Sequence, residues 1–130
     1  MGLYERAHGR LLEALETVRN TDDGLVRLHS MTRILGTLAQ NRLEAGDLAQ
    51  AVSYVAQGWE AQKAIGECIP CDVSLYPTSI PIYLALGDWD GAAWATKRAE
   101  ETAANFGSKA WSATAVYVRG LLAKSTGDMA

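Results

Sequence analysis

Apolar residues recur every three or four positions along most of the chain, as they do in helices that bury one face. Together with the positions of Gly, Pro and Asp, this period predicts six helical segments. Their expected ranges are residues 3–19, 25–45, 48–66, 73–86, 89–106 and 109–125. Sustained alternation of apolar and polar residues, which marks a half-buried strand, is missing from the sequence. The pattern therefore predicts an all-α protein.

The fourth segment is the least regular of the six, because it contains Pro77 and Pro81. Each proline lacks the amide hydrogen that a helix uses, and an interior proline costs a helix about 3 kcal/mol. We expect residues 67–72 to form a loop and the first turn after it to be irregular. A regular helix is expected from Ser79, with Pro81 in its first turn.

Glycines recur along the chain at nearly constant spacing. Gly2, Gly46, Gly87 and Gly127 are separated by 44, 41 and 40 residues, and Asp follows each of the last three. Residues at fixed distances from these glycines also recur: Ala39, Ile80 and Gly120 seven before, and Ala7, Ala51 and Ala92 five after. Such spacing predicts a repeat of helix pairs in which a left-handed glycine ends the first helix of each pair.

The run Ile80-x-x-Tyr83-x-x-x-Gly87-Asp88-Trp89-x-x-Ala92 resembles the consensus of the tetratricopeptide repeat (TPR), and two other runs resemble it as well. These two runs are Ala39…Gly46-Asp47-Leu48-x-x-Ala51 and Gly2-Leu3-Tyr4-x-x-Ala7. The resemblance implies a single domain over residues 1–130, with antiparallel helix hairpins stacked in a right-handed TPR-like α-solenoid. The chain departs from the family in its longer period, against about 34 residues, and in lacking the closing proline.

A narrower resemblance concerns the second half of the chain. The runs Cys68-x-x-Cys71-Asp72…Tyr83-Leu84-Ala85-Leu86-Gly87-Asp88 and Ala99-Glu100…Phe106-Gly107-Ser108-x-Ala110-Trp111 are similar to repeat regions of large bacterial transcriptional regulators of the LuxR type. This resemblance implies that the chain is a segment that senses an inducer or holds a partner protein. Because the first and last units are incomplete in this register, we expect a piece of a longer array. The alternative is a stand-alone protein whose open ends form a homodimer.

The TPR register also implies a binding groove, because the first helix of each pair lines the groove in that family. The residues it places there are Arg33, Gln40, Leu43, Glu44, Thr78, Leu84, Tyr117, Leu121 and Lys124, with Ser74, Pro77 and Thr114 beside them. This mixture of polar and apolar side chains is typical of a surface that binds a peptide or a protein. The sequence leaves open that the same face is simply solvated.

A second hypothesis places a small-molecule pocket between helix pairs. Four aromatic residues, Tyr76, Tyr83, Trp111 and Tyr117, follow or flank the proline-containing segment. Such a pocket would make the chain a sensing domain rather than a scaffold. Among the tryptophans, we expect Trp59 and Trp89 to fill gaps between helices, and Trp94 and Trp111 to be candidates for an exposed binding face.

The charge balance argues against nucleic acid and membrane partners. The net charge is −3, from 12 basic and 15 acidic residues, and the basic residues are dispersed rather than gathered in a stripe. The sequence has no uncharged apolar run long enough to span a bilayer and no recognisable secretory signal at residue 1. We therefore expect a cytoplasmic protein.

The sequence Cys68-Ile69-Pro70-Cys71 has the spacing of a redox dithiol and of half a zinc site. A second such pair is missing, and the two histidines, His8 and His29, are distant in sequence. Three hypotheses remain: packed structural cysteines, which we favour, a labile disulfide, or a zinc ion shared across a dimer. We accordingly expect no metal and no cofactor.

Motifs for catalysis are missing from the sequence. The acidic pairs Asp22-Asp23 and Asp88…Asp90 precede helical segments, where carboxylates cap free amides. Neither a Gly-x-Ser-x-Gly elbow nor a phosphate-binding loop occurs. We predict no catalytic residues and a protein that is not an enzyme.

Overall fold

A computed structural model describes residues 2–66 and 68–127, and all regular structure within these ranges is helical. The elements are α1 (Leu3–Arg19), α2 (Gly24–Glu44), α3 (Leu48–Ile65), α4 (Ile69–Asp72), α5 (Leu75–Ala85), α6 (Trp89–Phe106) and α7 (Lys109–Thr126). The all-α prediction is confirmed, and the six long helices match the predicted segments to within two residues at most ends. None of the described helices combines the length and hydropathy needed to cross a bilayer.

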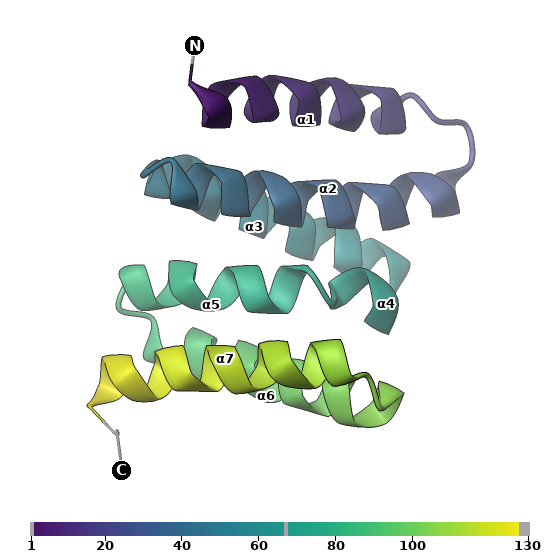
Figure 1. Cartoon of the computed structure of the whole chain (residues 1–130). Coiled ribbons are helices and arrows are strands. Elements are labelled where there is room, and N and C mark those ends of the chain that lie inside the picture. Colours follow the sequence, from purple (N-terminus) through teal and green to yellow (C-terminus); the bar gives the residue numbers. More distant parts are fainter. Residues whose placement is uncertain (1, 67, 128–130) are drawn as a thin grey trace.

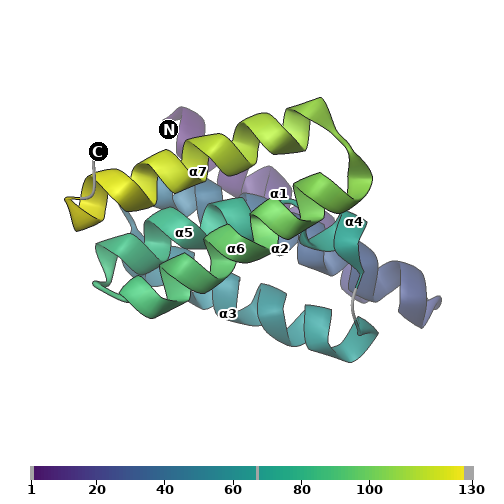
Figure 2. The same cartoon turned by 90° about the horizontal axis from the view of Figure 1, so that it is seen from below.

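The helices form stacked antiparallel neighbours with α5 at the centre. Figure 1 shows α1, α2, α5 and α7 one below another, with α3 behind α2 and α6 behind α7, and Figure 2 shows the same stack from below. The contacts agree with this view: α2 packs on α1 and α3, and α6 packs on α5 and α7. α5 contacts α2, α3, α6 and α7. Helix α5 therefore joins the α2–α3 pair to the α6–α7 pair.

The joints after α2 and after α5 have the same backbone geometry. Gly46 and Gly87 have φ of 83° and 72°, in the left-handed region that favours glycine. Each glycine amide donates to the carbonyl three residues earlier, and the next amide donates to the carbonyl five residues earlier, at 2.8 Å for Asp47 and 2.9 Å for Asp88. This is the Schellman arrangement. The sequence prediction of two glycine-closed hairpins is thus confirmed.

The same aspartates then begin the next helix. The carboxylate of Asp47 accepts the amide of Gln50 at 3.0 Å, and that of Asp88 accepts the amide of Gly91 at 2.9 Å. Asp23 caps α2 in the same manner. These side chains satisfy amides that lack an intrahelical acceptor and favour the positive end of the helix dipole. The expectation that the two acidic pairs cap helices is confirmed for Asp23 and Asp88, while Asp90 lies inside the first turn of α6.

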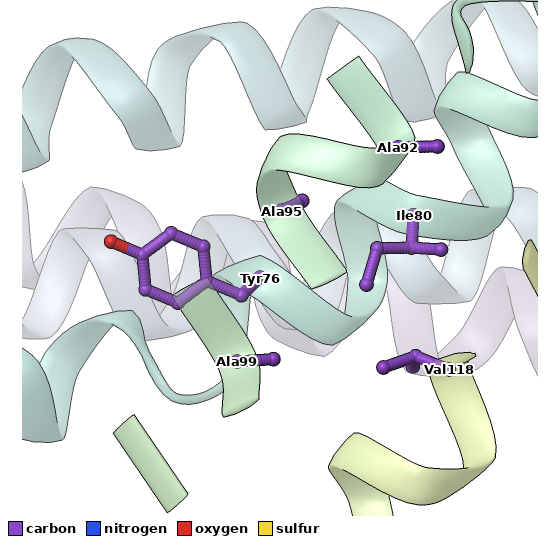
Figure 3. Packing of buried hydrophobic residues seen from close by; sticks show 6 residues of the cluster. All are labelled: Tyr76, Ile80, Ala92, Ala95, Ala99 and Val118. Carbon is purple, nitrogen blue, oxygen red and sulfur yellow. The ribbon is translucent and has the colours of Figure 1, made fainter. Parts of the chain in front are cut away.

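Residues at fixed distances from the two joint glycines occupy the core. Ala39 and Ile80, seven residues before, and Ala51 and Ala92, five after, are all 0% exposed. Figure 3 shows how the second set meets: Ile80 and Tyr76 of α5 face Ala92, Ala95 and Ala99 of α6, with Val118 of α7 beside them. Small residues on α6 let the two helix axes approach closely, and larger ones on α5 fill the space.

The residues that belong to the repeat at the two ends of the chain do not share all the features of the two central units. Gly2 has φ of −65° and begins α1 in an extended conformation, so it is not a left-handed joint as the sequence pattern implied. Gly127 is left-handed, with φ of 75°. Gly120, which aligns with Ala39 and Ile80, is exposed, and a Cβ there would meet no atom within 4 Å. Among the described residues no helix covers that face of α7.

The region around the prolines differs from the prediction. Residues 69–72 form the short helix α4 instead of a loop, while residue 67 lies outside the described residues. α5 begins at Leu75, not Ser79, so Pro81 lies inside the helix. Pro77 is tolerated because first-turn amides have no acceptor within the helix. Pro81 is tolerated because packing outweighs propensity: its neighbours Ile80 and Ile82 are completely buried.

Helix α1 is attached through an apolar contact and a buried arginine. Leu15 of α1 packs with Leu35 and Leu38 of α2. Arg42 of α2 is 4% exposed, and its Nη1 donates to Glu5 Oε1 at 2.9 Å. Its Nη2 also donates to the carbonyl of Tyr4 at 3.2 Å. The buried cation therefore links α2 to the first turn of α1, and it also donates to Asn41 of its own helix.

Candidate functional site

A groove runs across α2, α5 and α7. Its largest hollow has a volume of about 360 Å³. Six of the residues predicted from the TPR register line it: Gln40, Leu43, Glu44, Thr78, Tyr117 and Leu121. Pro77, Pro81, Thr114 and Val118 complete the walls. Residues from three helices, separated by up to 81 positions in the sequence, therefore meet in one depression.

Two smaller hollows continue this depression. One, of about 230 Å³, shares Gln40, Pro77, Thr78 and Thr114 with the first. The next, of about 260 Å³, shares Pro77 and Thr114 with both and lies between α5, α6 and α7. Because neighbouring hollows share walls, they form one elongated groove. We call it the α2–α5–α7 groove.

Several polar atoms of the groove are free to accept hydrogen bonds. The hydroxyl of Thr78 donates to the carbonyl of Ser74 at 2.8 Å, and that of Thr114 donates to the carbonyl of Ala110 at 3.1 Å. Their lone pairs are left for an incoming donor. The Glu44 carboxylate already accepts one bond, from Gln40 Nε2 at 2.9 Å, and can accept more. A ligand that offers N–H groups and apolar side chains matches this lining.

Three predicted groove residues do not line these hollows. Leu84 packs against the core cluster that contains Tyr76 and Val118, so it serves α5–α6 packing instead. Arg33 and Lys124 are exposed on α2 and on the last turn of α7. Sequence reasoning missed Pro81 as a groove residue, because it treated that proline only as a helix start. Its spacing of four from Pro77 placed both on one helical face.

The aromatic residues proposed for a small-molecule pocket do not share one cavity. Tyr76 and Tyr83 line a cavity of about 640 Å³. Trp111 and Tyr76 line the 260 Å³ hollow of the α2–α5–α7 groove, and Tyr117 lines its 360 Å³ hollow. The 640 Å³ cavity instead contains two tryptophans that the sequence prediction did not include in the pocket, Trp59 of α3 and Trp94 of α6.

The rings in this cavity pack closely on one another. Trp59 lies 5.1 Å from Tyr76 and 5.3 Å from Trp94 between ring centroids, and its Nε1 donates to Tyr83 Oη at 3.1 Å. Burial raises the pKa of Tyr83, so this phenol stays neutral. We call Trp59, Tyr76, Tyr83 and Trp94 the aromatic cluster. Trp94 is 47% exposed, as expected, but Trp89 is equally exposed and does not fill a gap between helices.

The two histidines have different surroundings. His8 Nε2 lies 2.9 Å from Tyr54 Oη, where it links α1 to α3. His29 lies against the cysteine pair, with its Nδ1 2.7 Å from Cys71 Sγ. The sequence analysis did not predict this contact, because 42 residues separate His29 from Cys71. The packing of α2 on α4 brings the two side chains together.

Comparisons of the chain with family models, with curated proteins and with solved structures found no match. The site is therefore interpreted from its own geometry.

Proposed function

We propose that this domain binds an extended segment of a partner protein in the α2–α5–α7 groove and catalyses no reaction. The observation that carries the proposal is the convergence of Gln40, Thr78 and Tyr117 from three helices on one elongated depression. Its acceptor atoms suit the amide hydrogens of a peptide, and its proline and leucine walls suit apolar side chains. Tyr117 is 65% exposed and supplies a large amphipathic anchor.

The repeated joint supports a TPR-like architecture for the same proposal. The Schellman turn and the aspartate cap recur at Gly46 and Gly87, separated by 41 residues, and the core positions on either side recur with them. Repeats of this kind cannot bury their faces alone and so stack. We propose a right-handed solenoid of helix hairpins whose first helices form the groove.

A selection from a displayed peptide library, followed by calorimetric titration of the selected peptides, tests the proposal. Tyr117→Ala should weaken binding of a selected peptide at least about tenfold, since truncation of a hot-spot residue costs about 2 kcal/mol or more. The matched control is Val116→Ala, which removes a neighbouring side chain that is 69% exposed and lies outside the groove. Equal loss in both variants, or binding unaffected by Tyr117→Ala, would contradict the assignment to this groove.

A second candidate function is supported by the aromatic cluster. Its cavity of about 640 Å³ is lined by four aromatic rings and has the size of a small-molecule site. A planar aromatic metabolite could stack on Trp94. In a thermal-shift screen, a true ligand should lose its stabilising effect in Trp94→Ala and retain it in Trp89→Ala. Both tryptophans are 47% exposed, but only Trp94 lines the cavity, so the pair is a matched control.

We also propose, from the sequence alone, the kind of protein and cellular process to which this domain belongs. Similarity to LuxR-type regulators suggests a role in bacterial signalling or transcription, with a cytoplasmic location and without direct contact to nucleic acid. In the intact regulator, Tyr117→Ala should abolish retention of its protein partner in a pull-down, whereas Val116→Ala should not.

A further inference from the structure

Three metal-ligating side chains converge beside the start of α5. His29 Nδ1 lies 2.7 Å from Cys71 Sγ, and Cys68 Sγ lies 2.8 Å from the same sulfur. The ligand atoms of all three residues lie within 4.8 Å of one another. Cys71 is buried, while Cys68 and His29 are partly buried. Neither the groove nor the aromatic cluster includes any of these residues.

Local backbone geometry explains why the cysteines point to one place. The amide of Cys71 donates to the carbonyl of Cys68 at 2.9 Å, which closes a turn at the start of α4. This turn brings the two Cβ atoms to the same side. α2 packs on α4, and His29 lies on the α2 face that meets it. The cluster therefore joins two elements that are far apart in the sequence.

We propose that Cys68, Cys71 and His29 bind one zinc ion within a single chain. Two thiolates and one imidazole are the donors that Zn²⁺ prefers, and three protein ligands leave a fourth position for water or another donor. With Zn–S bonds of about 2.3 Å, tetrahedral sulfurs lie roughly 3.8 Å apart. The two thiols therefore need to separate by about 1 Å, which rotation about their Cα–Cβ bonds permits.

The charges of such a complex balance. Zn²⁺ replaces the protons of two thiols, so binding releases two protons and leaves a neutral centre with two thiolates and a neutral imidazole. Neutrality suits a partly buried position, where an uncompensated charge would be costly. A disulfide between Cys68 and Cys71 would need an external oxidant and would give His29 no role. The zinc hypothesis uses all three side chains and needs no second copy of the chain.

The proposed zinc would act as a staple between α2 and α4. It would fix the segment that leads into Val73 and Ser74, which form one end of the groove. Because the ligands come together only in the folded chain, zinc binding would also stabilise the fold. The inference does not depend on peptide binding, since the ligands lie outside the groove lining.

Titration of the reduced, metal-free chain with Zn²⁺ and Co²⁺ tests the proposal. We expect one ion per chain, a higher melting temperature with zinc, and close to two protons released per zinc at neutral pH, measured with a pH indicator. Co²⁺ should give a thiolate charge-transfer band and the intense visible absorption of a tetrahedral site. Binding without proton release, or cobalt spectra of an octahedral oxygen site, would overturn the proposal.

Single substitutions identify the ligands. Cys68→Ser, Cys71→Ser and His29→Gln should each weaken zinc binding by more than the roughly 10–100-fold typical for loss of an outer-shell partner. Cys68→Ser should release one proton instead of two. His8→Gln, which changes a histidine outside the cluster, should leave the zinc affinity unchanged. Because His29 is only partly buried, His29→Gln should retain the helical circular dichroism, and unaltered zinc affinity in that folded variant would overturn the assignment.

Discussion

Gly58 is a buried position at which one methyl group should matter. It lies on α3 against α5, and a Cβ built there would lie 2.8 Å from Leu75 Cδ1. Leu75 is 0% exposed, so it has little room to move. We expect Gly58→Ala to lower the free energy of unfolding by about 1–2 kcal/mol, because overpacking outweighs the better helix propensity of alanine. Urea denaturation measures the difference.

Gly120 supplies the matched control for that experiment. It is also inside a helix, but a Cβ there would meet no atom within 4 Å. Gly120→Ala should therefore raise the free energy of unfolding by about 0.5–1 kcal/mol. If both substitutions stabilise the protein equally, the structure does not have the close contact between α3 and α5 on which this prediction depends.

His8 should make stability depend on pH. Burial lowers the pKa of His8 below 6.5, and the charge of Arg42 lowers it further, against the opposing effects of Glu5 and Asp47. As the pH falls through 6.5, the unfolded chain takes up a proton at this residue before the folded chain does. His8 therefore contributes a loss of stability that begins near that pH and is complete below the folded pKa.

His8→Gln isolates this contribution. The variant should lose less stability than the wild type between about pH 7.5 and pH 5, because glutamine does not titrate in the range where histidine does. Chemical denaturation at several pH values gives the two curves. Parallel curves would show that His8 has the same pKa in the folded and unfolded chains.

At the residue scale, helix register was enough to predict that certain side chains lie together, while their role in binding stays a prediction. Gln40, Thr78 and Tyr117 line the groove because each occupies a similar face of its helix. Sequence reasoning failed where two distant segments meet. Nothing in the local pattern relates His29 to Cys71, since their contact depends on how α2 packs against α4.

Among the elements, α1 is held at its first turn by the buried Arg42, together with Asn41, whose Nδ2 donates to the Tyr4 carbonyl at 3.2 Å. Arg42 donates to Glu5, to the Tyr4 carbonyl and to Asn41 Oδ1 at distances between 2.7 and 3.2 Å. Arg42→Ala removes these bonds and leaves Asn41, itself buried, with unsatisfied hydrogen-bonding capacity. We expect a loss of about 1–3 kcal/mol in the free energy of unfolding.

The control for Arg42 is an arginine on the surface. Arg10 pairs with Glu13 one turn away, and its side chain is 83% exposed. Arg10→Ala should change the stability by less than about 0.5 kcal/mol. Limited proteolysis should also cut between α1 and α2 faster in Arg42→Ala than in Arg10→Ala. Equal cleavage would mean that Arg42 does not hold α1.

Element boundaries were predicted well wherever glycine and aspartate mark them. α3 and α6 both begin directly after a Gly-Asp pair, and the sequence located both starts. The regular part of the fourth helix was predicted to begin at Ser79, four residues after α5 begins, because propensity rules give an interior proline a cost that burial of Ile80 and Ile82 outweighs. That balance depends on tertiary contacts, which a local pattern does not contain.

For the whole molecule, the uncovered ends suggest self-association. On α7, Val116, which lies outside the groove, is 69% exposed, and on α1 Leu3 is 72% exposed. We propose that two copies pair through these ends. Light scattering should then report twice the chain mass, with or without reductant, because the cysteines lie at α4 and not on α1 or α7.

Val116→Lys tests the proposed dimer directly. A charge in the centre of the α7 face should shift the protein to a monomer, while Ala49→Lys, at an exposed position on α3 outside the groove, should not. A wild-type monomer, or a dimer unaffected by Val116→Lys, would contradict pairing through α7.

The two prolines of α5 have a consequence for how the molecule unfolds. An 11-residue helix with an interior proline has almost no stability of its own, so α5 exists only while its neighbours on both sides hold it. In most repeat arrays, successive units can melt one after another. Here the loss of either flanking hairpin removes the surface on which α5 forms, and the other hairpin then loses its partner. The chain should behave as one cooperative unit, with amide exchange in α3 and α6 limited by the same global opening.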